Sequence, residues 1–305
     1  MVAGKAPLGP WLEVVLGGLM SGVLYSLVAL GLVLIFKASG VFNFAQGAMV
    51  LFAALSLVRI YEKLPLWAAI IATLAIMIAL AWVVERLVLR PLVNQEGIVL
   101  FMATLGIAYF LDGFGQILWG NNVFTLDVGM PKEPKILLEN VFEGGILVSM
   151  EDVLAALIAA MLVALLAAFF QKTATGRALR AVADDHQAAQ SIGIPLNRIW
   201  VIVWSVSGIV ALVAGIVWGS KLGVQFSLQQ VALKALPVVI LGGFTSVPGA
   251  IVGGLIIGLG EKLSEVYLGP ALGGGIENWF AYVLALVFLL FRPEGLFGER
   301  HIDRV

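Results

Sequence analysis

Long apolar stretches separated by short polar segments dominate the chain. These stretches cover residues 11–36, 41–58, 66–89, 97–119, 153–170, 199–219, 231–244, 248–268 and 279–291. A helix needs about 20 mostly apolar residues to cross the hydrocarbon core, so the pattern predicts about eight or nine transmembrane or half-membrane helices. Strands of a transmembrane barrel would instead alternate over about 10 residues. The sequence therefore predicts an all-α polytopic membrane protein, and its first apolar stretch is expected to be a membrane helix rather than a cleaved signal peptide.

Two discontinuous segments interrupt the pattern of simple spans. A single helix over residues 11–58 would be about 70 Å long at about 1.5 Å per residue, well beyond the roughly 30 Å hydrocarbon core. A turn is expected at residues 37–40, and Asn43 and Gln46 have capping-box spacing for a new helix. The second break follows Leu241-Gly242-Gly243, where Ser246 can cap a helix and Pro248 suits its first turn.

Paired interruptions of this kind are the best sequence indication of a substrate site in a transporter. The end of a half-helix carries free N–H groups and a positive dipole, which can hold a carboxylate. The alternative is that these polar residues only satisfy backbone groups at a helix start. The candidate pathway residues at the breaks are Asn43, Phe44, Gln46, Gly47, Gly242, Gly243 and Ser246.

Asp112 is the ionisable residue that we single out within the apolar stretches. A carboxylate at mid-membrane costs roughly 2.5–3.5 kcal/mol on insertion scales, so it is a functional candidate by default. It is added to the candidate pathway, with a vestibule or a structural pairing as the alternative.

Composition narrows the classes of function. Charged residues make up 12% of the chain, the mean hydropathy is +1.05 and cysteine is absent, which excludes disulfides and thiolate chemistry. The net charge of −1 gives no reason to expect nucleic acid as a partner. No metal-ligand spacing and no catalytic triad is found, and Asp184 and Asp185 point about 100° apart on a helix, so an enzyme is not expected.

A polar segment at residues 171–198 carries the most informative motif. Residues 178–191 are predicted to form one helix that Gly193 and Pro195 terminate. The bias of Lys and Arg is weak, but it is compatible with this segment in the cytoplasm and the acidic loop at residues 120–152 outside.

Gln187-Ala188-Ala189 followed by Gly193 is similar to the Glu-Ala-Ala-x-x-x-Gly signature of ABC importer permeases. Asn43-Phe44-Ala45-Gln46-Gly47, the Gly242-Gly243 to Pro248-Gly249 segment and Arg292-Pro293-Glu294-Gly295-Leu296-Phe297-Gly298 resemble the branched-chain amino-acid permease family, in particular its H-type subunit. The resemblance covers residues 15–298 in order. Gln187 replaces the usual Glu, Gln46 the usual His, and Ala48 an acidic residue.

The resemblance implies a permease subunit of an ABC importer for branched-chain amino acids, although relatives carry urea, amides or aromatic acids. It implies a second homologous permease, two ATPase subunits and an extracytoplasmic binding protein as partners, in the lipid of a bacterial inner membrane. The sequence has no Gly-x-x-x-x-Gly-Lys-Ser/Thr motif, so ATP is expected to be hydrolysed by the partners, with no cofactor or metal bound by this chain. The residues expected to couple to the ATPase are Arg177, Arg180, Asp184, Gln187, Ala188, Ala189 and Gly193.

The alternative is a self-sufficient carrier or channel for small hydrophobic amino acids. Residues 1–305 are expected to form a single transmembrane domain. Glycines spaced four residues apart, such as Gly18 and Gly22 or Gly254 and Gly258, indicate close helix packing or a subunit interface.

Overall fold

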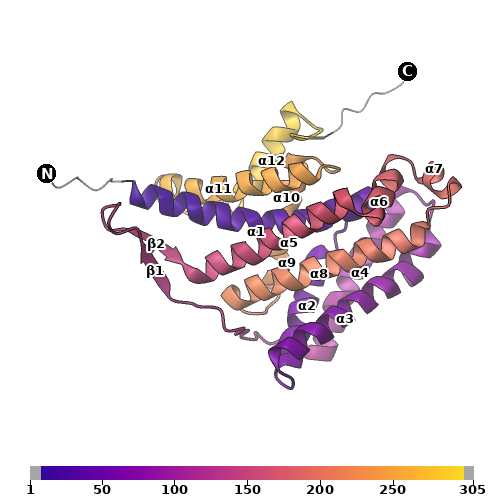
Figure 1. The fold of residues 1–305 in the computed structure, drawn as a ribbon, viewed down its shortest axis with the longest axis horizontal. Helices are drawn as coiled ribbons and strands as arrows, with labels where there is room; N and C mark the ends of the chain where they lie inside the picture. Colours follow the sequence, from indigo (N-terminus) through magenta and orange to yellow (C-terminus); the bar gives the residue numbers. More distant parts are fainter. Residues whose placement is uncertain (1–7, 299–305) are drawn as a thin grey trace. The chain divides into compact units, whose positions relative to one another are not determined.

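The computed structural model describes residues 8–298, and helices make up most of this part of the chain (Figure 1). The long helices are α1 (Gly9–Ser39), α2 (Gln46–Tyr61), α3 (Leu66–Val84), α4 (Gly97–Trp119), α5 (Met150–Lys172), α8 (Leu196–Leu222), α11 (Val247–Leu272) and α12 (Phe280–Phe291). The shorter ones are α6 (Ala174–Asp184), α7 (His186–Ser191), α9 (Ser227–Leu233) and α10 (Ala235–Gly242), with η1 (Glu85–Leu89), η2 (Arg90–Leu92) and η3 (Ile276–Asn278). Arg300 and Arg304, which contribute to the Lys and Arg bias, lie outside the described residues.

The helices follow the apolar stretches of the sequence. Within residues 8–298, six helices are long and apolar enough to cross a membrane, and three shorter apolar helical segments accompany them. The protein is therefore a multi-pass membrane protein. One apolar stretch, residues 231–244, is not a single helix, because the chain breaks at Lys234 between α9 and α10.

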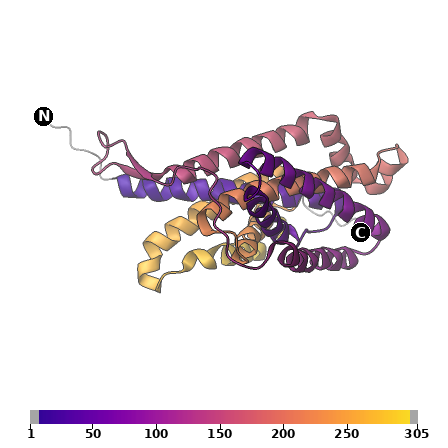
Figure 2. The same ribbon diagram turned by 90° about the horizontal axis from the view of Figure 1, so that it is seen from below.

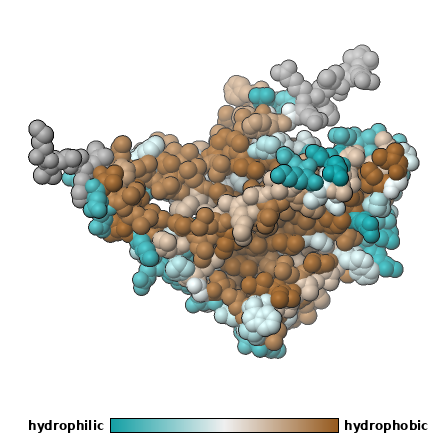
Figure 3. All heavy atoms as spheres, in the orientation of Figure 1, coloured by the Kyte–Doolittle hydropathy of each residue, from teal (hydrophilic) through white to brown (hydrophobic). Residues whose placement is uncertain are grey.

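Exposed apolar side chains cover the outside of several helices. Leu157, Met161 and Leu165 lie four residues apart on α5 and are each about 60% exposed. Brown, hydrophobic atoms accordingly predominate over the helices seen in Figure 3, and teal, hydrophilic atoms gather around α6. A helix that exposes such a stripe is suited to hydrocarbon rather than to water.

The described chain divides into two compact units. The first contains residues 8–27, 129–162 and 234–298, and the second contains residues 28–128 and 163–233. The expectation of a single transmembrane domain stays a prediction.

Close helix contact organises the first unit. A Cβ placed on Gly22 would lie 2.7 Å from the carbonyl oxygen of Gly254, and one on Gly18 would lie 3.0 Å from that of Gly258. Only glycine permits this approach, so these spaced glycines join α1 to α11 within the chain. In Figures 1 and 2, α11 is accompanied by α10 and α12 in orange to yellow.

A β-hairpin also belongs to the first unit, and the all-α prediction did not include it. Strand β1 (Pro134–Leu137) pairs antiparallel with β2 (Ile146–Ser149), with Pro134 opposite Ser149 and Leu137 opposite Ile146. The backbone N–H of Leu147 donates to the Glu13 carboxylate at 2.6 Å. The hairpin is thereby attached to the start of α1.

Helix α2 lies at the centre of the second unit, in contact with α3, α4, α8 and α9. Its residues from Gln46 to Val58 are all buried. A helix that is apolar on every side is buried on every side, so the polar residues at its N-terminal end must find partners inside the protein.

Candidate functional site

The first discontinuous segment lies between α1 and α2. The predicted break between two helices is confirmed, but it lies later than expected. Helix α1 continues through Lys37 and Ala38 to Ser39, the chain turns from Gly40 with φ of +71°, and α2 begins at Gln46. The capping-box interpretation was wrong. The Asn43 Oδ1 accepts from the Ala45 N–H at 3.0 Å, which closes a turn ahead of the helix. The Gln46 side chain bonds to the Asn43 side chain and to Ser207, not to the Asn43 backbone N–H.

Asn43, Gln46 and Ser207 of α8 form a neutral polar cluster, and each is no more than 1% exposed. Asn43 Nδ2 donates to Gln46 Oε1 at 3.3 Å, the Ser207 hydroxyl donates to the same oxygen, and Gln46 Nε2 donates to the Ser207 carbonyl at 3.4 Å. These groups satisfy one another without a formal charge, as buried polar groups must.

Phe44 and Gly47 fix the surroundings of this cluster. The Phe44 ring packs edge-on against Phe101, with centroids 4.8 Å apart. A Cβ on Gly47 would lie 2.8 Å from the Gln229 carbonyl oxygen, so α9 lies directly against the start of α2. Gly47 is thus a position of close backbone approach.

Asp112 of α4 is half-buried and shares Gln229 with this region. Its Oδ1 accepts from Gln229 Nε2 at 3.4 Å and from Gln116 Nε2 at 3.3 Å. Asp112 and Gly47 therefore both contact Gln229 of α9, although 65 positions separate them in the sequence.

The second discontinuous segment lies in the first unit. Ser246 caps α11 as predicted, its Oγ accepting from the Gly249 N–H at 2.9 Å. The C-terminal motif folds back onto the end of α10, because the N–H groups of Leu296 and Phe297 donate to the carbonyls of Leu241 and Gly242 at 2.8 and 3.1 Å. Two of the sequence motifs are thus in contact.

The eight pathway candidates fall into two sets. Gly242, Gly243 and Ser246 belong to the first unit, and the other five belong to the second. Their assignment to a substrate pathway stays a prediction.

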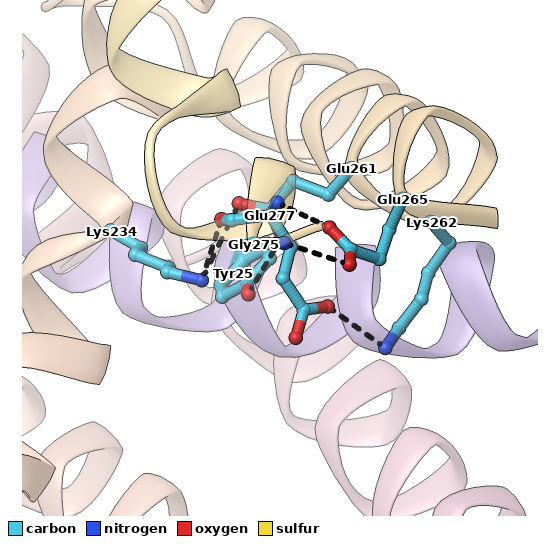
Figure 4. Close-up of polar contacts among 7 residues, drawn as sticks. All are labelled: Tyr25, Lys234, Glu261, Lys262, Glu265, Gly275 and Glu277. Atoms are coloured by element: carbon cyan, nitrogen blue, oxygen red, sulfur yellow. Dashed lines mark hydrogen bonds and ion pairs between the residues drawn. The ribbon is translucent and has the colours of Figure 1, made fainter. Parts of the chain in front are cut away.

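A charged cluster in the first unit was missed by the sequence analysis, which singled out Asp112 alone (Figure 4). Glu261 of α11 is 3% exposed. Its Oε2 accepts from the Tyr25 hydroxyl at 3.0 Å, and its Oε1 lies 3.7 Å from Lys234 Nζ. Lys234 also donates to the Glu277 carbonyl at 3.0 Å.

The rim of this cluster is more exposed. Lys262 pairs with the Glu277 carboxylate at 3.2 Å, and both side chains are about 40% exposed. Glu265 accepts from the N–H groups of Gly275 and Glu277 at 3.0 and 3.1 Å. The signal was visible in the sequence, since Lys234, Glu261, Lys262 and Glu265 stand within marked apolar stretches, but the high mean hydropathy of those stretches concealed them.

The segment predicted as one helix over residues 178–191 is two helices, so that prediction was wrong. Helix α6 ends at Asp184, and Asp185 has extended backbone. The Asp185 carboxylate then caps α7 by accepting from the N–H groups of Gln187 and Ala188 at 2.9 and 3.0 Å. The favourable N-cap explains the break.

The predicted stop at Gly193 is confirmed. Gly193 has φ of +89°, and the N–H of Ile194 donates to the Ala189 carbonyl at 3.0 Å, which satisfies the helix end. Ala189 is buried and Arg180 is half-buried, whereas the other coupling candidates are exposed: Arg177, Asp184, Gln187, Ala188 and Gly193.

His186, at the start of α7, contacts the end of α1. His186 Nε2 lies 2.9 Å from the Ala38 carbonyl oxygen, and Trp200 Nε1 donates to the same oxygen at 2.9 Å. The polar segment is therefore attached to the chain just ahead of the Asn43 turn.

Within residues 8–298, no group of three His, Asp or Glu side chains has an arrangement that could hold a metal ion. The prediction that the chain binds no cofactor remains untested.

Comparison with known proteins gives relatives that match from end to end. The chain is 28% identical to the high-affinity branched-chain amino acid transport system permease protein LivH of Salmonella typhimurium, over 97% of this chain and 98% of the relative. It is 27% identical to the corresponding protein BraD of Pseudomonas aeruginosa over 97% and 98%. It is 29% identical to the probable permease LivH of Methanocaldococcus jannaschii over 92% and 91%.

These relatives are transport subunits, which agrees with the expectation that the chain is not an enzyme. The same match does not favour the alternative of a self-sufficient carrier. The family described as "Branched-chain amino acid transport system / permease component" matches residues 14–292. Because this match covers most of the sequence, the chain belongs to this family of transport-system permeases.

Proposed function

We propose that the chain is one of two homologous permease subunits in an ABC importer of branched-chain amino acids or chemically related small amino acids. In this proposal, two cytoplasmic ATPase subunits supply the energy and an extracytoplasmic binding protein delivers the substrate. The complex lies in a bacterial inner membrane. The family match over residues 14–292 is the observation that carries the proposal.

The proposed topology has eight or nine crossings or partial crossings. It combines the six long helices with the shorter apolar segments α2, α9–α10 and α12. Residues 171–198 face the cytoplasm and residues 120–152 face outside. The breaks before α2 and α11 line the pathway, where polar backbone is tolerated only beside protein or a watery cavity.

The coupling segment is proposed to be α6, the Asp185 break, α7 and the Gly193 turn. It presents Arg177, Asp184, Gln187 and Ala188 on its exposed side, together with Ile192, which is 76% exposed. An apolar side chain exposed among polar ones is suited to a protein interface. The bond between His186 and Ala38 supplies a connection from this segment to the end of α1.

A pulldown of the tagged chain from native membranes, followed by mass spectrometry, tests the assembly. We expect two ATPase subunits, a second multi-span subunit and a binding protein. Recovery of the chain alone as a homo-oligomer would contradict the proposal and favour the self-sufficient carrier.

Gly193→Pro tests the coupling assignment. Proline cannot adopt the φ of +89° at this position, so the turn after α7 cannot form. We expect membrane insertion to persist and uptake to fall to background. Gly97→Pro is the matched control, because it places the same residue at the first position of α4, where proline is tolerated. Normal uptake by Gly193→Pro would rule out the coupling role.

A further inference from the structure

A small cavity in the second unit lies at the C-terminal end of α4. In the proposed topology, this end of the helix faces the outside of the cell. Its volume is about 40 Å³, and it is open to its surroundings. This is smaller than the roughly 300–1,000 Å³ of most ligand pockets, so a small molecule held by its polar wall would extend through the opening. Of the residues that line the cavity, Asp112 is the charged one.

The lining is divided by chemistry. Neutral amides gather beside the carboxylate, from Gln116, Asn121, Asn122 and Gln225. Leu51 and Leu55 of α2 and Phe226 supply an apolar wall. A molecule that matches this lining has three features. It has a cationic group for the carboxylate, an anionic or other hydrogen-bonding group for the amides, and an apolar side chain for the apolar wall.

The backbone holds the polar walls in place. Phe124 and Val224 exchange N–H to carbonyl hydrogen bonds of 3.1 and 2.8 Å, which fixes the loop after α4 against the segment before α9. The indole N–H of Trp119 donates to the Ser56 hydroxyl at 3.0 Å. The asparagines and Gln225 are therefore presented from anchored backbone.

Asp112 retains capacity for a ligand. Its hydrogen bonds come from two neutral amides at 3.3 and 3.4 Å, both long, and none of the ion pairs given for residues 8–298 includes it. A carboxylate held in this way, in a helix of high hydropathy, is poorly compensated. A primary ammonium group would supply the missing charge and up to three hydrogen bonds.

We propose that this cavity is a receiving site for an amino acid, in which Asp112 binds the α-ammonium group. The amides bind the α-carboxylate, and Leu51, Leu55 and Phe226 contact the apolar side chain. The proposal rests on the proposed function and narrows its substrates to zwitterionic amino acids, since urea, simple amides and deaminated acids lack the ammonium group.

Photolabelling of the purified importer complex tests the site. The probe is a leucine analogue with a diazirine in its side chain, and labelled peptides are identified by mass spectrometry. We expect labelling at Leu51, Leu55 or Phe226. Excess leucine should suppress it, whereas 4-methylpentanoate, which is leucine without its amino group, should not. This comparison uses the wild-type protein, so it does not depend on the folding of a variant.

Asp112→Asn should lower the labelling by about 10-fold or more, the effect of losing a charge-assisted hydrogen bond. Asp112→Glu should recover part of it. Glu96→Gln, which removes a carboxylate at the other end of α4, is the matched control and should not change it. Equal labelling in wild type and Asp112→Asn, or equal competition by 4-methylpentanoate, would overturn the proposal.

Leucine uptake by the same complex in vesicles separates the two hypotheses. Uptake without Asp112-dependent labelling contradicts the receiving site and leaves the importer function intact. Asp112-dependent labelling without uptake supports the receiving site and contradicts the proposed importer function.

Discussion

Each of the two units buries a polar cluster among apolar helices, and the two clusters are built differently. In the second unit, Asn43, Gln46 and Ser207 are neutral and bond to one another. In the first unit, Glu261 is ionisable and relies on Lys234 and Tyr25. Removing one residue from the neutral cluster leaves no unpaired charge. Removing Lys234 from the charged cluster leaves Glu261 as a buried charge without its partner.

The two clusters differ in the energetic cost of removing one hydrogen-bonding or ionic partner. A buried charge without its partner keeps the full cost of desolvation, while a neutral amide loses one modest hydrogen bond. The charged cluster should therefore be the more sensitive of the two, and most sensitive at its most buried residue.

Lys234→Met should give the largest loss of stability. Methionine keeps the length of the side chain but leaves Glu261, which is 3% exposed, without its cation. The expected cost is about 3–5 kcal/mol of unfolding free energy, the range for breaking a buried ion pair. SDS titration of the purified complex measures it.

The matched control for this change is Lys262→Met. Lys262 belongs to the same cluster, but it and Glu277 are about 40% exposed, so its loss should cost less than about 1 kcal/mol. Adding Glu261→Gln to Lys234→Met should recover part of the stability. Equal effects of the two lysine changes would contradict the distinction between the centre and the rim of the cluster.

Tyr25→Phe should give an intermediate loss. It removes only the hydroxyl that donates to Glu261 at 3.0 Å and keeps the ring in place. A hydrogen bond to a charged group contributes about 1.5–3 kcal/mol. The same SDS titration applies, and a loss as large as that of Lys234→Met would show that the hydroxyl, rather than the lysine, compensates the carboxylate.

Ser207→Ala should give the smallest loss of the three. Gln46 Oε1 would still accept from Asn43, and no charge would be left behind. Hydrogen bonds between membrane helices average about 0.6 kcal/mol and reach about 1.7 kcal/mol. Ser205→Ala, on the same helix, is a suitable control in thermal unfolding of the complex. A loss above about 3 kcal/mol would mean that neutral and charged clusters do not differ as argued.

The sequence predicted much of the fold because several of its signals are local. The stretch over residues 97–119 coincides with α4, the cap at Ser246 formed where expected, and the break after α1 formed at Gly40, the last residue of the predicted turn. It failed where two local preferences competed. At Asp185, a strong N-cap outweighed the continuation of the helix, and at Asn43 an Asx turn replaced the capping box.

By itself, the sequence determined that the chain crosses a membrane several times, that its apolar stretches are interrupted near Gly40 and before Ser246, and which family it resembles. The physical reason is that helices in lipid satisfy their backbone locally, and their lengths are set by the bilayer. Only the tertiary structure decided which polar residues meet. Gln46 and Ser207 are 161 residues apart, and Tyr25 and Glu261 are 236 apart. No local pattern specifies such pairs, because they depend on which helix faces pack together.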